Sequence, residues 1–222
     1  MHIGFGRVSE LFLEDGYRYA RLSCPEELVP GPGQYLLAGD DSDSLLPVPI
    51  YYTDSAPRGF IGPVPDSWEP GEVLRLRGPL GHGFSLPASA RKVALASFDG
   101  NPARLRGLIR PALRQEASVV FQGESNTEHL PDDVEVLSLA ALEEILEWAD
   151  YIALDMRRED LQGVRERLRG QNRSSVLMAA QVLVHTSMPC GGVAECGVCA
   201  LTTKSEWKLI CKDGPVFHWK DL

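Results

Sequence analysis

The stretch MPCGGVAECGVCALTTKSEWKLICKDGPVF, residues 188–217, holds four of the five cysteines of this 222-residue chain. Their spacing is C-x5-C-x2-C-x11-C, and the four residues are Cys190, Cys196, Cys199 and Cys211. Four thiolates are the complete ligand set of a [2Fe-2S] cluster, with two on each iron. Glycine allows the φ angles that turn backbone N–H groups toward sulfur, and the loop contains Gly191, Gly192 and Gly197. The stretch therefore predicts a [2Fe-2S] site.

Two other uses of clustered thiols compete with this interpretation. A structural zinc site also takes four cysteines, but such sites usually present two C-x2-C pairs. Here only Cys196 and Cys199 form such a pair. Disulfide frameworks are typical of proteins in oxidising compartments, which makes them the least favoured interpretation here. The cysteine pattern therefore favours an iron–sulfur cluster over a zinc site, and a zinc site over disulfides. The fifth cysteine, Cys24, stands in an apolar-flanked stretch and is interpreted as a buried thiol.

Composition and charge exclude several classes of partner. Hydrophobic residues make up 44% and charged residues 24% of the chain, as in ordinary globular proteins. The formal net charge of −9 argues against nucleic acid, because phosphate binding needs a basic surface. No apolar run approaches the ~20 residues of a membrane-spanning helix, and MHIGFGRVSELFLEDG lacks the features of a signal peptide. We therefore expect a cytoplasmic protein without a membrane or nucleic-acid partner.

Residues 1–90 have the pattern of antiparallel β-structure. The runs YRYARLSC, QYLLAG, VPIYYT and EVLRLRG are separated by turns rich in glycine and proline. This spacing is typical of a small barrel or sandwich, and we predict an antiparallel β-barrel.

Residues 91–173 alternate predicted strands with predicted helices. The strands are VALASF, ASVVFQG, VEVLSL and DYIALDM, and the helices are ARLRGLIRPALRQ, LAALEEILEWA and REDLQGVRERLRG. Such alternation predicts a parallel sheet flanked by helices, as in a Rossmann-like domain. Residues 174–222 form a third unit, in which SSVLMAAQVLVHT is predicted as one helix before the cysteine loops. The predicted class is α+β multidomain: a β-barrel, a Rossmann-like α/β domain and a small C-terminal iron–sulfur domain.

The cysteine motif also resembles a known family. C-G-x4-C-G-x-C followed by C-K-D-G-P-V-F is similar to the electron-transfer subunit of class B dihydroorotate dehydrogenase, in the ferredoxin–NADP reductase-like superfamily. PGQY at 32–35 and WEPGEVLRLRGPLGHGF at 68–84 resemble further family segments. The first gap between cysteines has five residues here, where the family usually has four.

The resemblance implies cofactors and a partner. It implies a flavin-reductase-like barrel that binds FAD, a nucleotide domain and a [2Fe-2S] domain. It also implies a hetero-oligomer with a flavin-containing catalytic subunit that oxidises dihydroorotate in pyrimidine biosynthesis, with electrons passing to NAD. By resemblance the flavin and nucleotide contacts fall on Val48, Pro49, Ile50, Tyr51, Gly78, Pro79, Leu80 and Gly100.

Several of these positions depart from the family pattern. The family has R-P-I-S where this chain has Val48-Pro49-Ile50-Tyr51, and valine cannot pair with a pyrophosphate as arginine does. We therefore expect FAD to be weakly bound or absent, with the cleft beside Val48 and Tyr51 narrowed by side chains.

The nucleotide turns are altered as well. FDGNP at 98–102 replaces the family's G-G-x-G-x-x-P, and Asp99 puts a negative charge where a phosphate would lie. LDM at 154–156 replaces a C-G-P turn, so we expect no NAD(H) oxidoreductase activity from the isolated chain. His82 and His185 have no carboxylate partner at a spacing that the sequence reveals, and both are interpreted as structural or exposed.

Two functions remain open from the sequence. One is an electron-transfer subunit of dihydroorotate dehydrogenase type, which passes electrons through the cluster between a flavin-bearing partner and an acceptor. The other is a cluster-only electron wire or assembly subunit of another oxidoreductase complex, without FAD or NAD. No catalytic residue is predicted for either.

Overall fold

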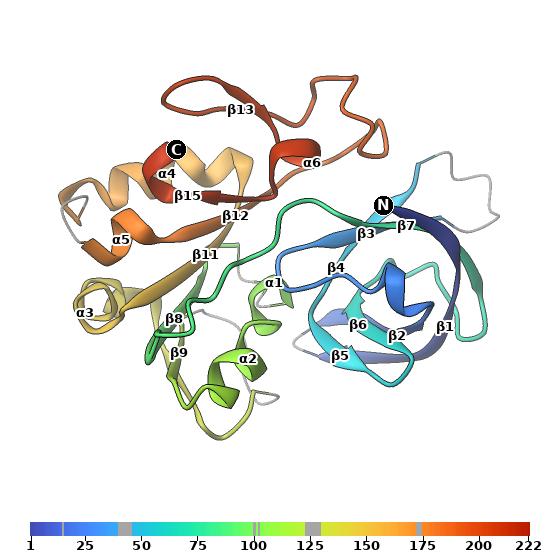
Figure 1. The fold of residues 1–222 in the computed structure, drawn as a ribbon, viewed down its shortest axis with the longest axis horizontal. Helices are drawn as coiled ribbons and strands as arrows, with labels where there is room; N and C mark the ends of the chain where they lie inside the picture. Colours follow the sequence, from blue (N-terminus) through green and yellow to red (C-terminus); the bar gives the residue numbers. More distant parts are fainter. Residues whose placement is uncertain (15, 40–45, 100, 102, 123–129, 172–174) are drawn as a thin grey trace.

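The computed structural model describes residues 1–222 except 15, 40–45, 100, 102, 123–129 and 172–174. Two sheets lie side by side: the N-terminal sheet is on the right of Figure 1, and a second sheet with its helices is on the left. The segments around β13 and α6 lie at the top of that view, above the junction of the two sheets.

The N-terminal sheet has seven antiparallel strands. They are β1 (His2–Glu14), β2 (Tyr17–Ser23), β3 (Tyr35–Gly39), β4 (Val48–Tyr51), β5 (Asp54–Ala56), β6 (Gly59–Pro63) and β7 (Val73–Leu80). Their order is β4-β3-β7-β1-β2-β6-β5. Among the described residues no pairing joins the edge strands β4 and β5, so the closed barrel predicted from the sequence is not confirmed. The antiparallel β-structure itself is confirmed.

Strand β3 lies between two hydrophobic cores. Leu36 packs in the core of the N-terminal sheet, while Tyr35 and Leu37 belong to a core that extends into the second sheet. Successive side chains of a strand point to opposite faces, so β3 joins the sheets through a shared apolar interior.

The second sheet has six strands in the order β10-β9-β8-β11-β12-β15. They are β8 (Lys92–Ser97), β9 (Ser118–Gln122), β10 (Val134–Leu137), β11 (Tyr151–Arg157), β12 (Gln181–His185) and β15 (Val216–His218). The first five in this order are parallel and β15 is antiparallel to β12. This confirms the predicted Rossmann-like parallel sheet.

Helices cover both faces of the second sheet. They are α1 (Ala103–Arg106), α2 (Ile109–Arg114), α3 (Leu142–Trp148), α4 (Leu161–Arg167) and α5 (Ser175–Ala179). Residues of α1 and α2 pack with Val93 and Leu95 of β8, whereas residues of α3, α4 and α5 share a core with Ala94 and Ala96. Because both faces are covered, β8 and β11 are almost continuously buried.

One predicted helix was wrong. Residues 174–186 were expected to form a single helix, but the chain forms α5 over Ser175–Ala179 and then the strand β12 over Gln181–His185. The segment VLV within β12 is fully buried and pairs with β11. Burial of β-branched side chains in the sheet therefore overrides the local helical pattern. The proposed unit boundaries at residues 90/91 and 173/174 stay predictions.

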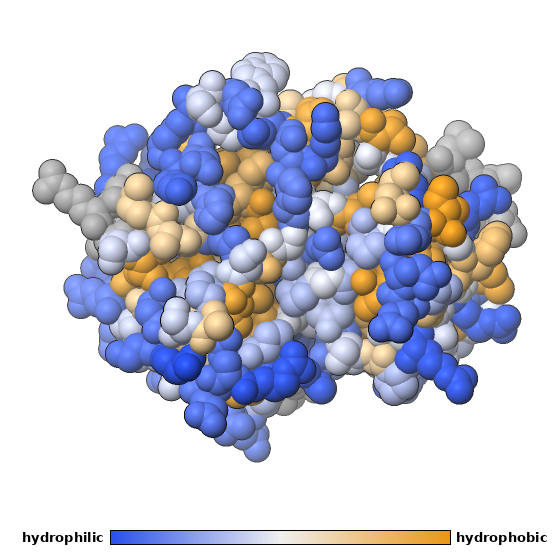
Figure 2. Space-filling model, viewed as in Figure 1, coloured by the Kyte–Doolittle hydropathy of each residue, from blue (hydrophilic) through white to orange (hydrophobic). Residues whose placement is uncertain are grey.

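The cysteine-bearing tail adds a small hairpin and one short helix. These are β13 (Ala200–Thr202), β14 (Trp207–Leu209) and α6 (Ile210–Asp213). Within the described ranges, no helix has both the length and the apolar character needed to cross a membrane. Figure 2 shows hydrophilic residues over most of one face, with apolar residues in several smaller groups on both its left and its right side.

Candidate functional site

The loop that carries the first three cysteines is tightly curled. Gly191, Gly192 and Gly197 have φ angles of 60°, 69° and 71°, and Ala194 has a φ of 63°. Side chains are disfavoured in this left-handed region, which glycine enters freely. The prediction that these glycines let the loop wrap is confirmed.

The four clustered thiols come together as two pairs. Cys190 is hydrogen-bonded to Cys196, and Cys211 is hydrogen-bonded to Cys199. The second pair is anchored by the hairpin, because the Ile210 N–H donates to the Cys199 carbonyl at 3.1 Å. Cys199 and Cys211 are buried, Cys190 is half-buried and Cys196 is exposed. The site therefore has a buried side and a side open to solvent.

Backbone N–H groups stabilise negative charge on the open side. Burial acts to raise the pKa of Cys190, but hydrogen bonds from the Cys196 thiol and from the amides of Cys196, Val193 and Glu195 lower it to about 6. Burial raises the pKa of Cys211 to about 12, and the nearby thiols of Cys199 and Cys190 act in the same direction. A bound metal would reverse the preference of Cys211 for its protonated form, because coordination favours the thiolate.

The pairing of the thiols fits a two-iron cluster, in which each iron takes two cysteine ligands. The two pairs are neighbours, because the Cys190 thiol acts on the pKa of Cys211. A structural zinc site would need all four sulfurs around one ion.

Cys24 packs against a different core from the two buried cysteines of the cluster, Cys199 and Cys211. It follows the last residue of β2, where its N–H donates to the Arg58 carbonyl at 3.0 Å, and it packs against the core of the N-terminal sheet. Burial raises the pKa of Cys24 to about 11, and Glu27 adds to the effect. The expected structural thiol is partly buried.

The N-terminal sheet braces the cysteine loop through residues that sequence reasoning missed. The Arg77 guanidinium donates to the Gly191 carbonyl, and the Tyr35 hydroxyl donates to the Cys211 carbonyl at 3.2 Å. A Cβ on Gly192 would lie 3.3 Å from the Leu37 side chain. Tyr35 and Arg77 lie in the family-like segments 32–35 and 68–84, but those segments gave no indication of contact with the cysteine loop.

A cleft of about 640 Å³ lies beside the loop. Residues 46–49 form an apolar wall, and the opposite side is formed by Arg157, Glu159 and residues 185–189. Cys190 directly follows this lining. The volume lies in the range of sites for small molecules and cofactors.

Of the residues Val48 to Tyr51, assigned to flavin contacts by resemblance, two line the cleft and two are buried in the core. Val48 and Pro49 line the cleft. Ile50 is fully buried, and the Tyr51 ring packs 5.4 Å from the Tyr35 ring with its hydroxyl inside the protein. Tyr51 turns into the core and does not line the cleft, so Tyr51 is not one of the side chains that would narrow it, and the narrowing beside Val48 stays a prediction.

The other flavin and nucleotide assignments lie away from the lining. Gly78 is buried, where a Cβ would lie 2.8 Å from Leu36. Pro79 and Leu80 are half-buried in β7. Gly100 lies outside the described residues. None of the described members of this group provides a cation for a pyrophosphate.

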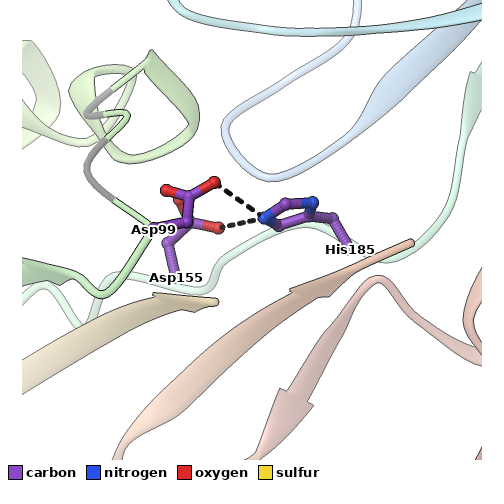
Figure 3. A group of neighbouring side chains, drawn as sticks. All are labelled: Asp99, Asp155 and His185. Carbon is purple, nitrogen blue, oxygen red and sulfur yellow. Dashed lines mark ion pairs between the residues drawn. The ribbon is translucent and has the colours of Figure 1, made fainter. Parts of the chain in front are cut away.

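A buried ionic network lies on the other side of the cleft, where parallel strands end. The Arg104 Nε donates to both oxygens of Asp155 at 2.9 and 3.1 Å, and a terminal nitrogen of Arg104 donates to Asp99. His185 Nε2 lies 3.0 Å from Asp99 Oδ2 and 3.9 Å from Asp155 Oδ1. Figure 3 shows the imidazole pointing at both carboxylates from the end of β12.

This network bears on two expectations. His185 has no carboxylate partner at a spacing that the sequence reveals, but in the fold it contacts Asp99, which lies 86 positions earlier in the chain. Asp99 was expected to present an unbalanced negative charge, but Arg104 neutralises it. Sequence spacing could not reveal the His185 contact, because β8 and β12 are distant in the chain and their ends meet only in the sheet. Arg104 lies only five positions after Asp99, so that pairing was open to inference from the sequence and was missed.

The two carboxyl groups have shifted pKa values. Burial acts to raise the pKa of Asp99, but His185, Arg104 and the Asn101 amide outweigh it and hold the pKa below its usual range. Burial raises the pKa of Asp155, although Arg104 opposes this. Asp99 is therefore the stable anion of the pair.

The family match lies in the cysteine-bearing tail. Residues 185–222 match the iron–sulfur cluster binding domain of dihydroorotate dehydrogenase B. This confirms the predicted resemblance in that segment and the iron–sulfur cluster. A stretch of 41 residues is 46% identical to sulfhydrogenase 1 subunit gamma from Pyrococcus furiosus. It covers 18% of this chain and only 14% of that relative.

Solved structures share the fold of nearly the whole chain. A chain of an NADH-dependent reduced ferredoxin–NADP oxidoreductase, studied for flavin-based electron bifurcation, superposes with a TM-score of 0.75 at 15% identity, over 97% of this chain and 88% of that chain. The flavohem-like FAD/NAD binding domain of nitric oxide dioxygenase from Vibrio cholerae O1 biovar El Tor gives 0.59 at 16% identity, over 82% and 98%. Identities this low show the fold alone, and the fold is of the predicted ferredoxin–NADP reductase-like type.

Proposed function

We propose that this chain is an electron-transfer subunit of dihydroorotate dehydrogenase type, whose Cys190, Cys196, Cys199 and Cys211 hold a [2Fe-2S] cluster. The observation that carries the proposal is that the four thiols gather as two neighbouring pairs. When bound, such a cluster supplies one-electron transfer at a potential set by its surroundings. The match of residues 185–222 supports the same chemistry.

The chain's own residues divide the site into a protected side and a docking side. Cys199 and Cys211 are buried beneath Tyr35, which limits solvent access. Cys196 is exposed, and Val193 and Val198 beside it in the sequence are 47% and 46% exposed. We assign this edge to a flavin-bearing partner subunit, because exposed apolar residues around a redox centre favour close contact with another protein.

The cleft beside Cys190 is the place where a flavin would fit, if this chain holds one. Its apolar wall at Val48 and Pro49 suits a planar ring, and Thr186 and Ser187 offer polar groups. Arg157 is the cation among the lining residues of this cleft. A single exposed arginine is a poor substitute for a bidentate pyrophosphate contact, so we expect FAD to be lost during purification.

A second candidate function is a cluster-only electron wire or assembly subunit of another oxidoreductase complex. The buried network of Arg104, Asp99 and Asp155 favours it, because those side chains fill the end of the parallel sheet where a dinucleotide would bind. The likeness of 41 residues to a sulfhydrogenase subunit is compatible with such a complex.

The test is purification under anaerobic conditions with iron, sulfide, zinc and flavin quantified together. We expect about two irons and two sulfides per chain, an EPR signal after reduction, and substoichiometric FAD. Cys24→Ser is the matched control and keeps the cluster. One zinc per chain without sulfide would refute the cluster, whereas stoichiometric FAD retained through gel filtration would refute only the weak-flavin proposal.

A further inference from the structure

Asp99 and Asp155 lie at the topological switch point of the parallel sheet. From β8 the strand order runs one way to β9 and β10 and the other way to β11 and β12. Ligands of open α/β sheets bind in the crevice outside the carboxyl ends of the strands at such a point. Asp99 follows β8, and Asp155 is near the end of β11.

The Asp99 carboxylate is surrounded by donors of the kind that bind phosphate. Its Oδ1 accepts the Asn101 backbone N–H at 3.0 Å and the Ser97 hydroxyl at 3.1 Å. Its Oδ2 receives the Arg104 guanidinium and lies 3.0 Å from His185 Nε2. A backbone amide, a hydroxyl, a guanidinium and an imidazole are a typical set of donors for a phosphoryl group.

These donors are built into the interior. The side chains of Asp99 and Arg104 are 5% and 8% exposed. Arg104 is fixed from behind by Asp155, which is completely buried, and its guanidinium lies 5.9 Å from the Tyr51 ring. The receptor would therefore keep its shape if the Asp99 carboxylate were removed.

We propose that Asp99 is an internal ligand of a phosphate-binding site, which it keeps closed to inorganic and nucleotide phosphates. The fold's dinucleotide is thus excluded by occupation of the site rather than by loss of the donors. This proposal is independent of the iron–sulfur cluster and of the proposed partner.

A metal site is the competing use of these residues. Asp99, Asp155 and His185 could each offer one ligand atom, but Arg104 already pairs with both carboxylates. A divalent cation would have to displace the buried guanidinium of Arg104 or be repelled by its like charge. This cost favours an anion-receptor role for the site.

The test is anion rescue in the intact holoprotein. We compare the wild type, Asp99→Ala, the isosteric Asp99→Asn and the control Asp54→Ala, which removes a partly exposed carboxylate paired with Arg110 at 3.0 Å. The melting temperature is measured with increasing inorganic pyrophosphate and with potassium chloride at equal ionic strength, while the cluster absorbance is followed to detect loss of iron.

Asp99→Ala should melt lower than the wild type and regain about 5 °C or more when pyrophosphate reaches ~100 times its Kd. The wild type and Asp54→Ala should respond only as they do to chloride. Asp99→Asn should show a smaller rescue, and it carries the test if the alanine variant fails to fold. Three results would each overturn the proposal. The first is an equal response of the Asp99 variants and the Asp54 control to pyrophosphate. The others are stabilisation of the wild type by pyrophosphate, or by Mg²⁺ or Zn²⁺.

Discussion

Arg104→Met removes the guanidinium between Asp99 and Asp155 while keeping most of the apolar stem. Arg104 is 7% exposed and Asp155 is 0% exposed, so the two carboxylates would lose their cation without gaining water. Removing one partner of a buried ion pair costs about 3–5 kcal/mol. For a chain of this length that corresponds to a fall in melting temperature of the order of 10 °C.

The assay is thermal and urea unfolding of the holoprotein at pH 7, followed by circular dichroism. Arg110→Met is the matched control, because the Arg110 side chain is 62% exposed and its pair with Asp54 should contribute about 1 kcal/mol or less. The double variant Arg104→Met/Asp155→Asn should recover part of the loss, because a neutral amide replaces the unpaired buried charge.

A loss for Arg104→Met within about 1 kcal/mol of the Arg110→Met loss would refute the reasoning. The reasoning would also be refuted if the loss of stability in the double variant equalled the sum of the two single losses, because two groups in one buried network must be coupled.

Three further predictions concern the cysteine loop and the ionic network. Cys199→Ser should abolish or strongly alter the iron–sulfur absorbance, and a wild-type spectrum and iron content would count against the ligand set. Arg77→Met should destabilise the protein by about 1.5 kcal/mol and lower the cluster's reduction potential, since a cation bound to the Gly191 carbonyl is lost; an unchanged potential in redox titration would contradict this. The pKa of Asp99 is held below its unfolded value of about 3.9, so its ionised form contributes stability that is present above about pH 4 and lost as the pH falls further. The difference in melting temperature between wild type and Asp99→Asn should therefore be largest near neutral pH and narrow below pH 4, and a constant difference would show that the charge is unimportant.

Local sequence signals predicted much of the metal site. Four cysteines with glycines between them indicate a curled loop and a metal–sulfur centre, because ligand number and φ freedom are properties of the residues themselves. The strands β2, β3, β4 and β7 of the first sheet and β8 to β11 of the second were predicted for a similar reason, because each contains a short apolar run bounded by turn residues.

Tertiary structure decided whatever depends on neighbours distant in the chain. Residues 181–185 form a strand because β11 offers a buried edge to pair with, and Tyr51 turns inward because Tyr35 and Arg104 lie beside it. The sequence revealed an acidic residue at position 99 but not its neutralisation. Arg104 lies only five positions after Asp99, but Asp155 and His185 reach the same site from distant strands. The charge balance of the buried site therefore depends on spatial distances that sequence spacing does not encode.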